Sequence, residues 1–130
     1  MAMERLKSLQ AYANAWEQSD EEKIRAWIDQ CWSTSSTYVN PLTDTVRGAD
    51  SLTRLILDYP VLFPDAQIRP AGEPETWPGH IRYPWRLTSS ARIRVLGHDY
   101  GYQLEGTDLI EFDADAKIRT VVSFFGAAPS

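Results

Sequence analysis

Residues 106–125 read GTDLIEFDADAKIRTVVSFF, and this stretch decides the fold. It completes one run of alternating apolar residues, Tyr102 to Phe112, and contains all of a second run, Ile118 to Phe125. The residues between the two runs, DADAK, are mostly polar and few enough for a tight turn. Two runs with a period of two, joined by such a turn, predict two neighbouring antiparallel strands.

In the first run, Asp108 shares one strand face with Ile110 and Phe112, because side chains two residues apart point the same way. Two interpretations fit this pattern. In one, the sheet twists at Gly106-Thr107 and Asp108 stays in water, as most aspartates do. In the other, the carboxyl lies in an apolar pocket, its pKa is raised, and it stays protonated and donates a hydrogen bond. The pattern leaves both open.

A further strand is predicted over residues 81–87, where apolar and polar residues alternate. The apolar members are Ile81, Tyr83, Trp85 and Leu87, and the polar ones are His80, Arg82, Pro84 and Arg86. Pro84 indicates an edge strand or a bulge, since proline lacks the N–H that a strand ladder uses. A bulge would exchange the inward and outward faces on either side of it. Whether His80 and Tyr83 face the core therefore stays open.

The first sixty residues have the apolar spacing of helices. This spacing predicts one helix from about 3 to 18 and a second after the capping-box pattern at 19–22. A third helix follows Gly48 and is closed by Pro60 and Pro64. Helices that precede an antiparallel sheet predict an α+β domain in which the helices cover one face of the sheet.

Composition excludes several functions. The 130 residues carry 13 Lys+Arg and 18 Asp+Glu, and the net charge of −5 argues against nucleic acid or an anionic membrane as a partner. Cys31 is the single cysteine, so an internal disulfide is excluded, and neither a metal site nor a cofactor is expected. With no signal-like start and no apolar stretch of membrane-spanning length, we expect one cytoplasmic domain over residues 1–130.

Three tracts support a more specific interpretation: Ala11 to Trp16, Cys31 to Gly48, and Gly106 to Gly126. In the second tract, residues 37–39 form a short β-type run that Asn40-Pro41 stops. Together the tracts resemble the SnoaL-like polyketide cyclase and ketosteroid isomerase-like branch of the nuclear transport factor 2-like superfamily. The resemblance implies a strongly curved antiparallel sheet wrapped around three helices, a cone with a deep apolar cavity. It does not specify function, because the superfamily includes isomerases, cyclases, dehydratases, epoxide hydrolases and non-catalytic binders.

The resemblance to the ketosteroid isomerase type also implies a catalytic site. Tyr12 and Asp108 match the tyrosine and the protonated aspartate that donate to a carbonyl oxygen as an enolate forms. The base of that type is an aspartate just before a proline. Here that position is Asn40, whose amide is no useful base near neutral pH. Either Asp44 or Glu105 takes over, or the pocket polarises a carbonyl without moving a proton by that route.

Aromatic side chains are numerous, with 5 Trp, 6 Tyr and 4 Phe, and they either fill a thick core or line a cavity. The resemblance and the face of Asp108 favour a cavity for a small, apolar, carbonyl-bearing ligand. Its expected lining is Trp16, Trp27, Tyr38, Trp85, Ile110, Phe112, Val121, Ser123 and Phe125. The expected function is an isomerase, cyclase or dehydratase of the enolisation type. The alternative is a non-catalytic domain that binds a hydrophobic ligand or acts through dimerisation.

Four arginines, at positions 82, 86, 92 and 94, partly alternate with apolar residues. They could lie on the outer sheet face and pair with acids across a homodimer, as members of the resembled family commonly dimerise. They could equally form a solvated edge of a monomer, and the sequence leaves the choice open.

Overall fold

A computed structural model describes residues 2–126. Along this part of the chain the helices are α1 (Ala2–Trp16), α2 (Glu21–Asp29) and α3 (Gly48–Leu62). The long strands are β1 (Trp32–Val39), β5 (His80–Thr88), β8 (Gln103–Phe112) and β9 (Ile118–Phe125). The short ones are β2 (Val46–Arg47), β3 (Gln67–Pro70), β4 (Glu75–Trp77), β6 (Arg94–Val95) and β7 (His98–Asp99).

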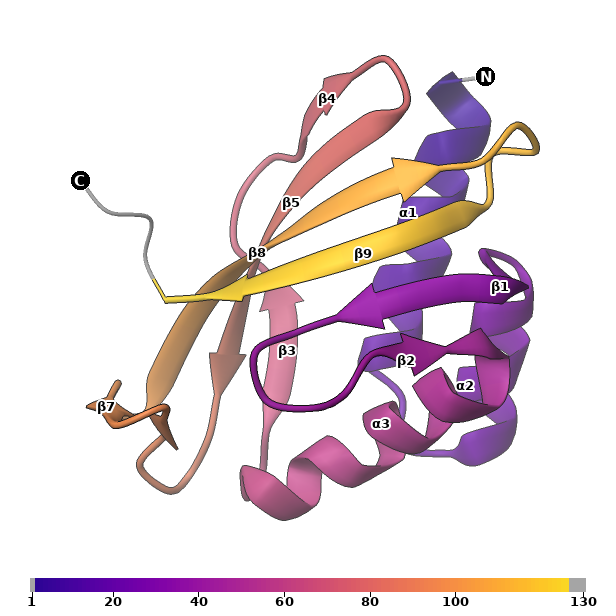
Figure 1. The fold of residues 1–130 in the computed structure, drawn as a ribbon. Helices are drawn as coiled ribbons and strands as arrows, with labels where there is room; N and C mark the ends of the chain where they lie inside the picture. The colour runs from indigo at the N-terminus through magenta and orange to yellow at the C-terminus, as the bar shows by residue number, and fades with distance from the viewer. Residues whose placement is uncertain (1, 127–130) are drawn as a thin grey trace.

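The main sheet has the strand order β2-β1-β9-β8-β5-β3, with β4 also paired to β5 (Figure 1). The hairpin predicted from the opening stretch is β8–β9, in which Asp108 pairs with Ser123. All pairs are antiparallel except β1–β9, which is parallel. The sequence predicted an antiparallel sheet throughout. Because no short turn joins β1 to β9, nothing in the local sequence fixes their relative direction.

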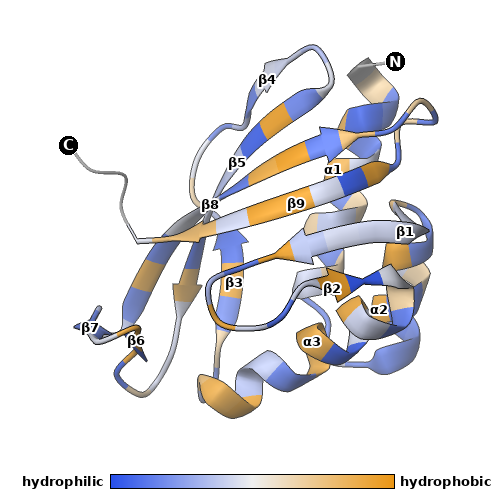
Figure 2. Cartoon of the chain, in the orientation of Figure 1, coloured by the Kyte–Doolittle hydropathy of each residue, from blue (hydrophilic) through white to orange (hydrophobic). Residues whose placement is uncertain are grey.

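The three helices lie on one face of the curved sheet, so the α+β prediction is confirmed (Figure 1). Apolar and polar residues alternate along β8 and β9, and the helices cover the apolar face (Figure 2). The core between the two layers includes Tyr12, Ile28, Ile56, Ile110 and Val121, all 1% exposed or less. None of the helices described over residues 2–126 is long and apolar enough to cross a membrane.

The start of α2 differs from the predicted capping box. Asp20, not Ser19, is the N-cap residue, with φ −94° and ψ 125°, and its carboxylate accepts the backbone N–H of Glu22 over 2.8 Å. Aspartate and serine are nearly equivalent N-caps, so the pattern at 19–22 fits either one. Which residue caps depends on where the turn after α1 places the chain. That turn begins earlier than predicted, because α1 ends at Trp16.

Pro84 produces neither an edge strand nor a bulge. β5 pairs with β8 in one continuous register from His80↔Glu111 to Thr88↔Gln103. On its other side, β3 ends at Pro70 and β4 begins at Glu75, so Pro84 faces the gap between them, where its carbonyl accepts the N–H of Ala71. The missing N–H therefore costs no ladder bond, and Tyr83 faces the core without interruption.

Candidate functional site

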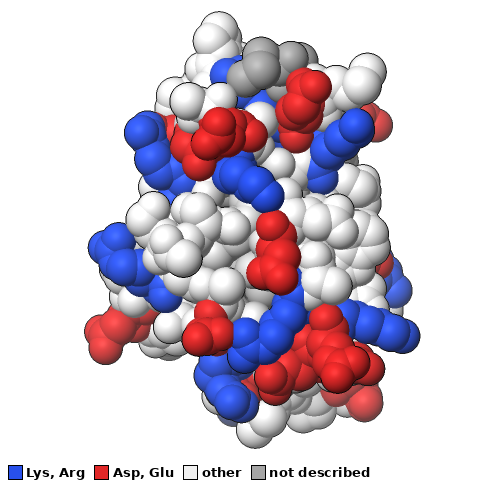
Figure 3. All heavy atoms as spheres, turned by 90° about the vertical axis from the view of Figure 1, so that its right-hand side faces the viewer, with Lys and Arg blue, Asp and Glu red and all other residues white. Residues whose placement is uncertain are grey.

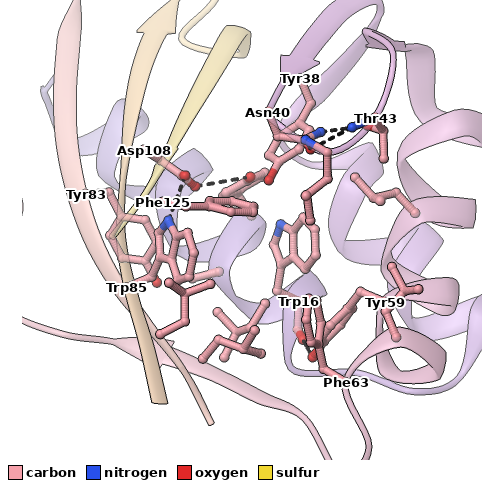
Figure 4. A pocket seen from close by; sticks show the side chains of 18 residues that line it. Trp16, Tyr38, Asn40, Thr43, Tyr59, Phe63, Tyr83, Trp85, Asp108 and Phe125 are labelled. Carbon is pink, nitrogen blue, oxygen red and sulfur yellow. Dashed lines mark hydrogen bonds between the residues drawn. The ribbon is translucent and has the colours of Figure 1, made fainter. Parts of the chain in front are cut away.

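A cavity lies between the sheet and the helices α1 and α3, and aromatic rings make up much of its wall (Figure 4). The lining residues are Tyr12, Ala13, Trp16, Tyr38, Asn40, Leu42, Thr43, Leu55, Tyr59, Leu62, Phe63, Ile68, Tyr83, Trp85, Leu87, Leu104, Asp108 and Phe125. Leu42 and Leu62 are 39% and 66% exposed, so the cavity opens between the loop after β1 and the end of α3.

Asp108 is the one acidic or basic residue among the lining residues that the structure describes. It is 4% exposed, so the carboxyl is buried, as the second interpretation of its sequence pattern expects, and does not lie in water. Its Oδ1 accepts the indole N–H of Trp85 over 2.8 Å, and its Oδ2 accepts the hydroxyl of Tyr12 over 3.4 Å. Figure 4 shows dashed bonds meeting at the Asp108 carboxyl, one of them from the indole of Trp85.

Burial raises the pKa of Asp108 to about 6. The donors around it, Ser123, Trp85 and Tyr12, favour the ionised carboxylate and oppose that rise. The carboxyl therefore changes between an acceptor and a hydrogen-bond donor within about one pH unit of neutrality. A group of this kind can hold, give or take a proton under ordinary conditions.

Tyr12 comes from α1 and is 1% exposed. Its ring stacks on Trp32 at a centroid distance of 6.1 Å and an interplanar angle of 14°. Burial, followed by the charge of Asp108, raises the pKa of Tyr12 well above its ordinary value of 10.0. The hydroxyl therefore keeps its proton and acts as a donor into the cavity.

Asn40 lines the cavity near its mouth, directly after β1. Its side-chain oxygen accepts the backbone N–H groups of Leu42 and Thr43 over 2.9 and 3.2 Å. Its amide donates to the Thr43 hydroxyl over 2.7 Å. Both ends of the side chain thus hold the turn in place, a common use of asparagine in loops. The arrangement gives Asn40 a structural task and leaves it no basic atom.

The two acids considered as replacements for the base lie elsewhere. Asp44 is exposed in the loop after β1. Glu105 is exposed on the outer side of β8, where it pairs with Arg86 over 2.9 Å. Neither side chain lines the cavity.

Four of the nine expected lining residues border the cavity: Trp16, Tyr38, Trp85 and Phe125. The other five lie outside the lining, namely Trp27, Ile110, Phe112, Val121 and Ser123. Four of these five are buried on the inner sheet face as expected, while Trp27 is a half-buried residue of α2 packed against the core. The first half of α1 covers the end of the sheet near the β8–β9 turn, as the bond from the Ser8 hydroxyl to the carbonyl of Ala116 shows. Side chains at that end therefore pack against the helix and do not face the cavity.

Sequence reasoning missed other rings of the lining, including Tyr59, Phe63 and Tyr83. Tyr83 had a signal, since it alternates with Trp85 on one strand face. His80, whose orientation was open, lies away from the cavity: its ring stacks on Trp77 at 5.8 Å. No cluster of three or more metal-binding side chains occurs within residues 2–126.

No family model matches the chain. No curated protein matches it by sequence. Solved structures do match. A proposed isomerase of the SnoaL-like family from Agrobacterium tumefaciens is 26% identical, with a TM-score of 0.78 over 96% of this chain and 99% of that one.

Two further structures agree with this match. A proposed SnoaL-like polyketide cyclase from Jannaschia is 12% identical, with a TM-score of 0.72 over 95% of this chain and 85% of that one. TerC, co-crystallised with polyporic acid, is 12% identical, with a TM-score of 0.71 over 94% and 91%. Others have ketosteroid isomerase-like, NTF2-like and cystatin-like folds. The chain therefore has the NTF2-like, cystatin-like fold, and SnoaL-like and ketosteroid isomerase-like proteins are its structural neighbours.

Proposed function

We propose that the protein binds a small, uncharged, largely apolar carbonyl compound in the cavity and promotes its enolisation, as a step of isomerisation, cyclisation or dehydration. One observation carries this proposal. The Tyr12 hydroxyl and Oδ2 of Asp108 lie side by side, 3.4 Å apart, in a buried site walled by aromatic rings. Two donors so placed stabilise an oxygen on which negative charge develops.

The proposed step starts with the substrate carbonyl oxygen between Tyr12 and the protonated Asp108. A C–H bond next to the carbonyl breaks, its electron pair moves toward the oxygen, and the two donors stabilise the resulting enolate. No second acid lines the cavity among the described residues, so the proton goes to water at the mouth. This restricts the reaction to substrates whose C–H bond is already acidic, such as carbons flanked by a carbonyl and an aromatic ring.

The second candidate function is non-catalytic binding of a hydrophobic ligand. Asn40 favours it, since its side chain holds the turn at the mouth and offers no base. Both candidates use the same cavity, and they differ in whether bound ketone loses a proton.

Deuterium exchange separates the two. 2-Tetralone, whose C1 protons lie between a ring and a carbonyl, is incubated with the protein in D₂O and followed by proton NMR. Catalysis predicts faster exchange at C1 than in buffer, and Tyr12→Phe should slow the catalysed rate about a hundredfold. Asp44→Asn, a change at an exposed acid, is the matched control and should leave the rate unchanged.

Asn40→Asp adds the base at the mouth and should raise the exchange rate further, because a carboxylate can accept the same two backbone N–H groups and keep the turn. Binding of 2-tetralone with no exchange above buffer, in the natural protein and in Asn40→Asp alike, would reject enolisation in favour of binding.

A further inference from the structure

Trp85 and Asp108 do not face each other directly across the sheet. In the β5–β8 register, Trp85 pairs with Gly106 and Tyr83 pairs with Asp108. The indole therefore reaches along β8 to place its Nε1 2.8 Å from Oδ1 of Asp108. To do so, the ring must cross the strand directly above Gly106.

Gly106 provides the space for this crossing. A Cβ atom at this position would overlap the six-membered ring of Trp85, meeting Cζ2, Cε2 and Cη2. The glycine is buried within β8, and its backbone is in a conformation that other residues adopt freely. The position therefore needs glycine for space and not for backbone conformation. Phe125 meets the indole edge-on, at 5.6 Å and 89°, and borders it on another side.

The indole N–H fixes which carboxyl oxygen carries the acidic proton. An indole nitrogen donates a hydrogen bond and cannot accept one. When Asp108 is protonated, Oδ1 must remain the acceptor for Trp85, so the proton resides on Oδ2. Oδ2 is the oxygen beside the Tyr12 hydroxyl.

The Tyr12 contact leaves room for a ligand. Its 3.4 Å length exceeds the usual range of about 2.5–3.0 Å for an O–H···O bond. An oxygen of a bound molecule can therefore replace this weak bond and accept from both hydroxyls, whereas the shorter bond from Trp85 stays in place.

We propose that Trp85 is a positioning residue that holds Oδ1 of Asp108 and thereby directs the acidic proton, on Oδ2, into the cavity beside Tyr12, and that Gly106 is required to admit its indole. The catalytic meaning of this arrangement rests on the proposed function. The arrangement itself is a property of the unliganded protein and can be tested without any ligand.

The test follows the Asp108 carboxyl by carbon-13 NMR during a pH titration, with Asp108→Asn to assign the signal. Trp85→Phe keeps a ring of related shape but removes the N–H that stabilises the carboxylate. It should raise the Asp108 pKa by about one unit. Gly106→Ala displaces the same indole and should shift the pKa in the same direction. Phe124→Leu changes an exposed ring on the outer side of β9, away from the carboxyl and from Trp85, and should leave the pKa where it is.

The other groups near Asp108 are constant in this experiment. The neighbours that affect its proton, or whose own pKa its charge raises, are Tyr12, Tyr38 and Tyr83, with Ser123 and Trp85 as uncharged donors. Burial holds the pKa of each tyrosine above its ordinary value, so none of them ionises over the titrated range.

A second readout connects the arrangement to ligand binding. At pH 5, Trp85→Phe should weaken 2-tetralone binding about tenfold, because the proton is no longer confined to Oδ2. An Asp108 pKa equal in Trp85→Phe and the natural protein would overturn the proposal, whether or not Gly106→Ala folds. A shifted pKa in a protein that neither binds nor exchanges 2-tetralone would instead uphold the arrangement and reject the proposed function.

Discussion

The buried carboxyl of Asp108 makes stability depend on pH. Its pKa is raised from 3.8 to about 6, so the folded protein binds this proton more readily than the unfolded chain does. The free energy of unfolding therefore falls as pH rises from about 4 to about 6 and then levels off. Over that interval the contribution amounts to about 3 kcal/mol.

Asp108→Asn should remove this pH dependence. Its side-chain oxygen can still accept the N–H of Trp85, and its amide can donate to Tyr12. We expect the variant to be more stable than the natural protein by up to about 3 kcal/mol at pH 7.5 and nearly equal at pH 4, measured by urea unfolding. The exposed Asp44→Asn serves as a control with little effect at either pH. An equal gain for Asp108→Asn at both pH values would show that ionisation of Asp108 is not the cause.

At the residue scale, the sequence could identify Asp108 as a candidate site residue but could not show that its carboxyl is buried. A strand pattern shows which residues share a face, whereas burial depends on what covers that face. The cover comes from α1, about a hundred residues earlier, and the shorter of the two hydrogen bonds comes from Trp85 on the neighbouring strand. The same limit explains Ile110 and Phe112, which share the face of Asp108 but are packed under α1 and leave no space.

At the element scale, the N-cap of α2 provides a direct test of the structure. Asp20→Ala should destabilise the protein by about 1 kcal/mol, because the N–H of Glu22 loses its acceptor. Ser19→Ala should have little effect, since Ser19 is exposed and lies outside the cap. Urea unfolding of both variants measures the difference. The reverse order of effects would favour the capping box predicted from the sequence.

The parallel junction of β1 with β9 depends on Ser36. Register shifts between Trp32 and Thr37, and there the buried Ser36 hydroxyl donates to the carbonyl of Ile118 over 2.6 Å and accepts the N–H of Ser33 over 2.9 Å. Ser36→Ala leaves the buried carbonyl of Ile118 and the half-buried N–H of Ser33 without their partner, and should cost about 2 kcal/mol of unfolding free energy. Ser35→Ala changes an exposed residue of the same strand and should cost much less. Similar losses for both variants would contradict this role.

Most of the long elements were predictable because periodicity is a local property, but β1, which spans Trp32–Val39, was predicted only as a short run over residues 37–39. The strands near 81–87, 102–112 and 118–125 and all three helices were found from spacing alone. The short strands β3 and β4 were not predicted. They are only a few residues long and lie among prolines, so they have too few positions to show a period. They exist because β5 offers them a free edge. In the sequence, Pro84 argued against a regular central strand. In the structure it interrupts no strand pairing, because it faces the gap between β3 and β4.

At the scale of the whole molecule, the outer sheet face bears on assembly. Arg82 pairs with Glu75 and Arg86 with Glu105, all within one chain. On the face drawn in Figure 3, acidic and basic side chains are likewise interspersed. These arginines thus have partners without a second copy, and exposed pairs of this kind contribute little stability.

A homodimer through the outer face stays a prediction, and Phe124, 55% exposed on the outer side of β9, is the residue to test. Light scattering over a concentration series should show a dimer that Phe124→Glu weakens. Val61→Glu, at an 80% exposed position on α3, should leave the dimer intact. A monomer mass at every concentration would remove the prediction.

The charged and uncharged residues that line the cavity predict which ligands bind. Asp108 is the one carboxyl group in the described lining, and no Lys, Arg or His joins it there. A neutral ketone should therefore bind best when Asp108 is protonated and can donate to it. From pH 7.5 to pH 5, the Kd of 2-acetylnaphthalene measured by calorimetry should fall about tenfold, since the pKa of Asp108 is about 6.

The anion 2-naphthoate is similar in shape to 2-acetylnaphthalene and tests how the cavity treats a negatively charged ligand. It gains no cationic partner in the cavity and should bind more weakly than the ketone at both pH values. Its binding should be weakest at pH 7.5, where it meets the ionised carboxylate. In Asp108→Asn the ketone should bind equally at both pH values, because the amide donates at each. A naphthoate affinity that matches or exceeds that of the ketone at pH 7.5 would mean that a cation reaches the bound ligand, and the cavity would then be a site for acids instead of ketones.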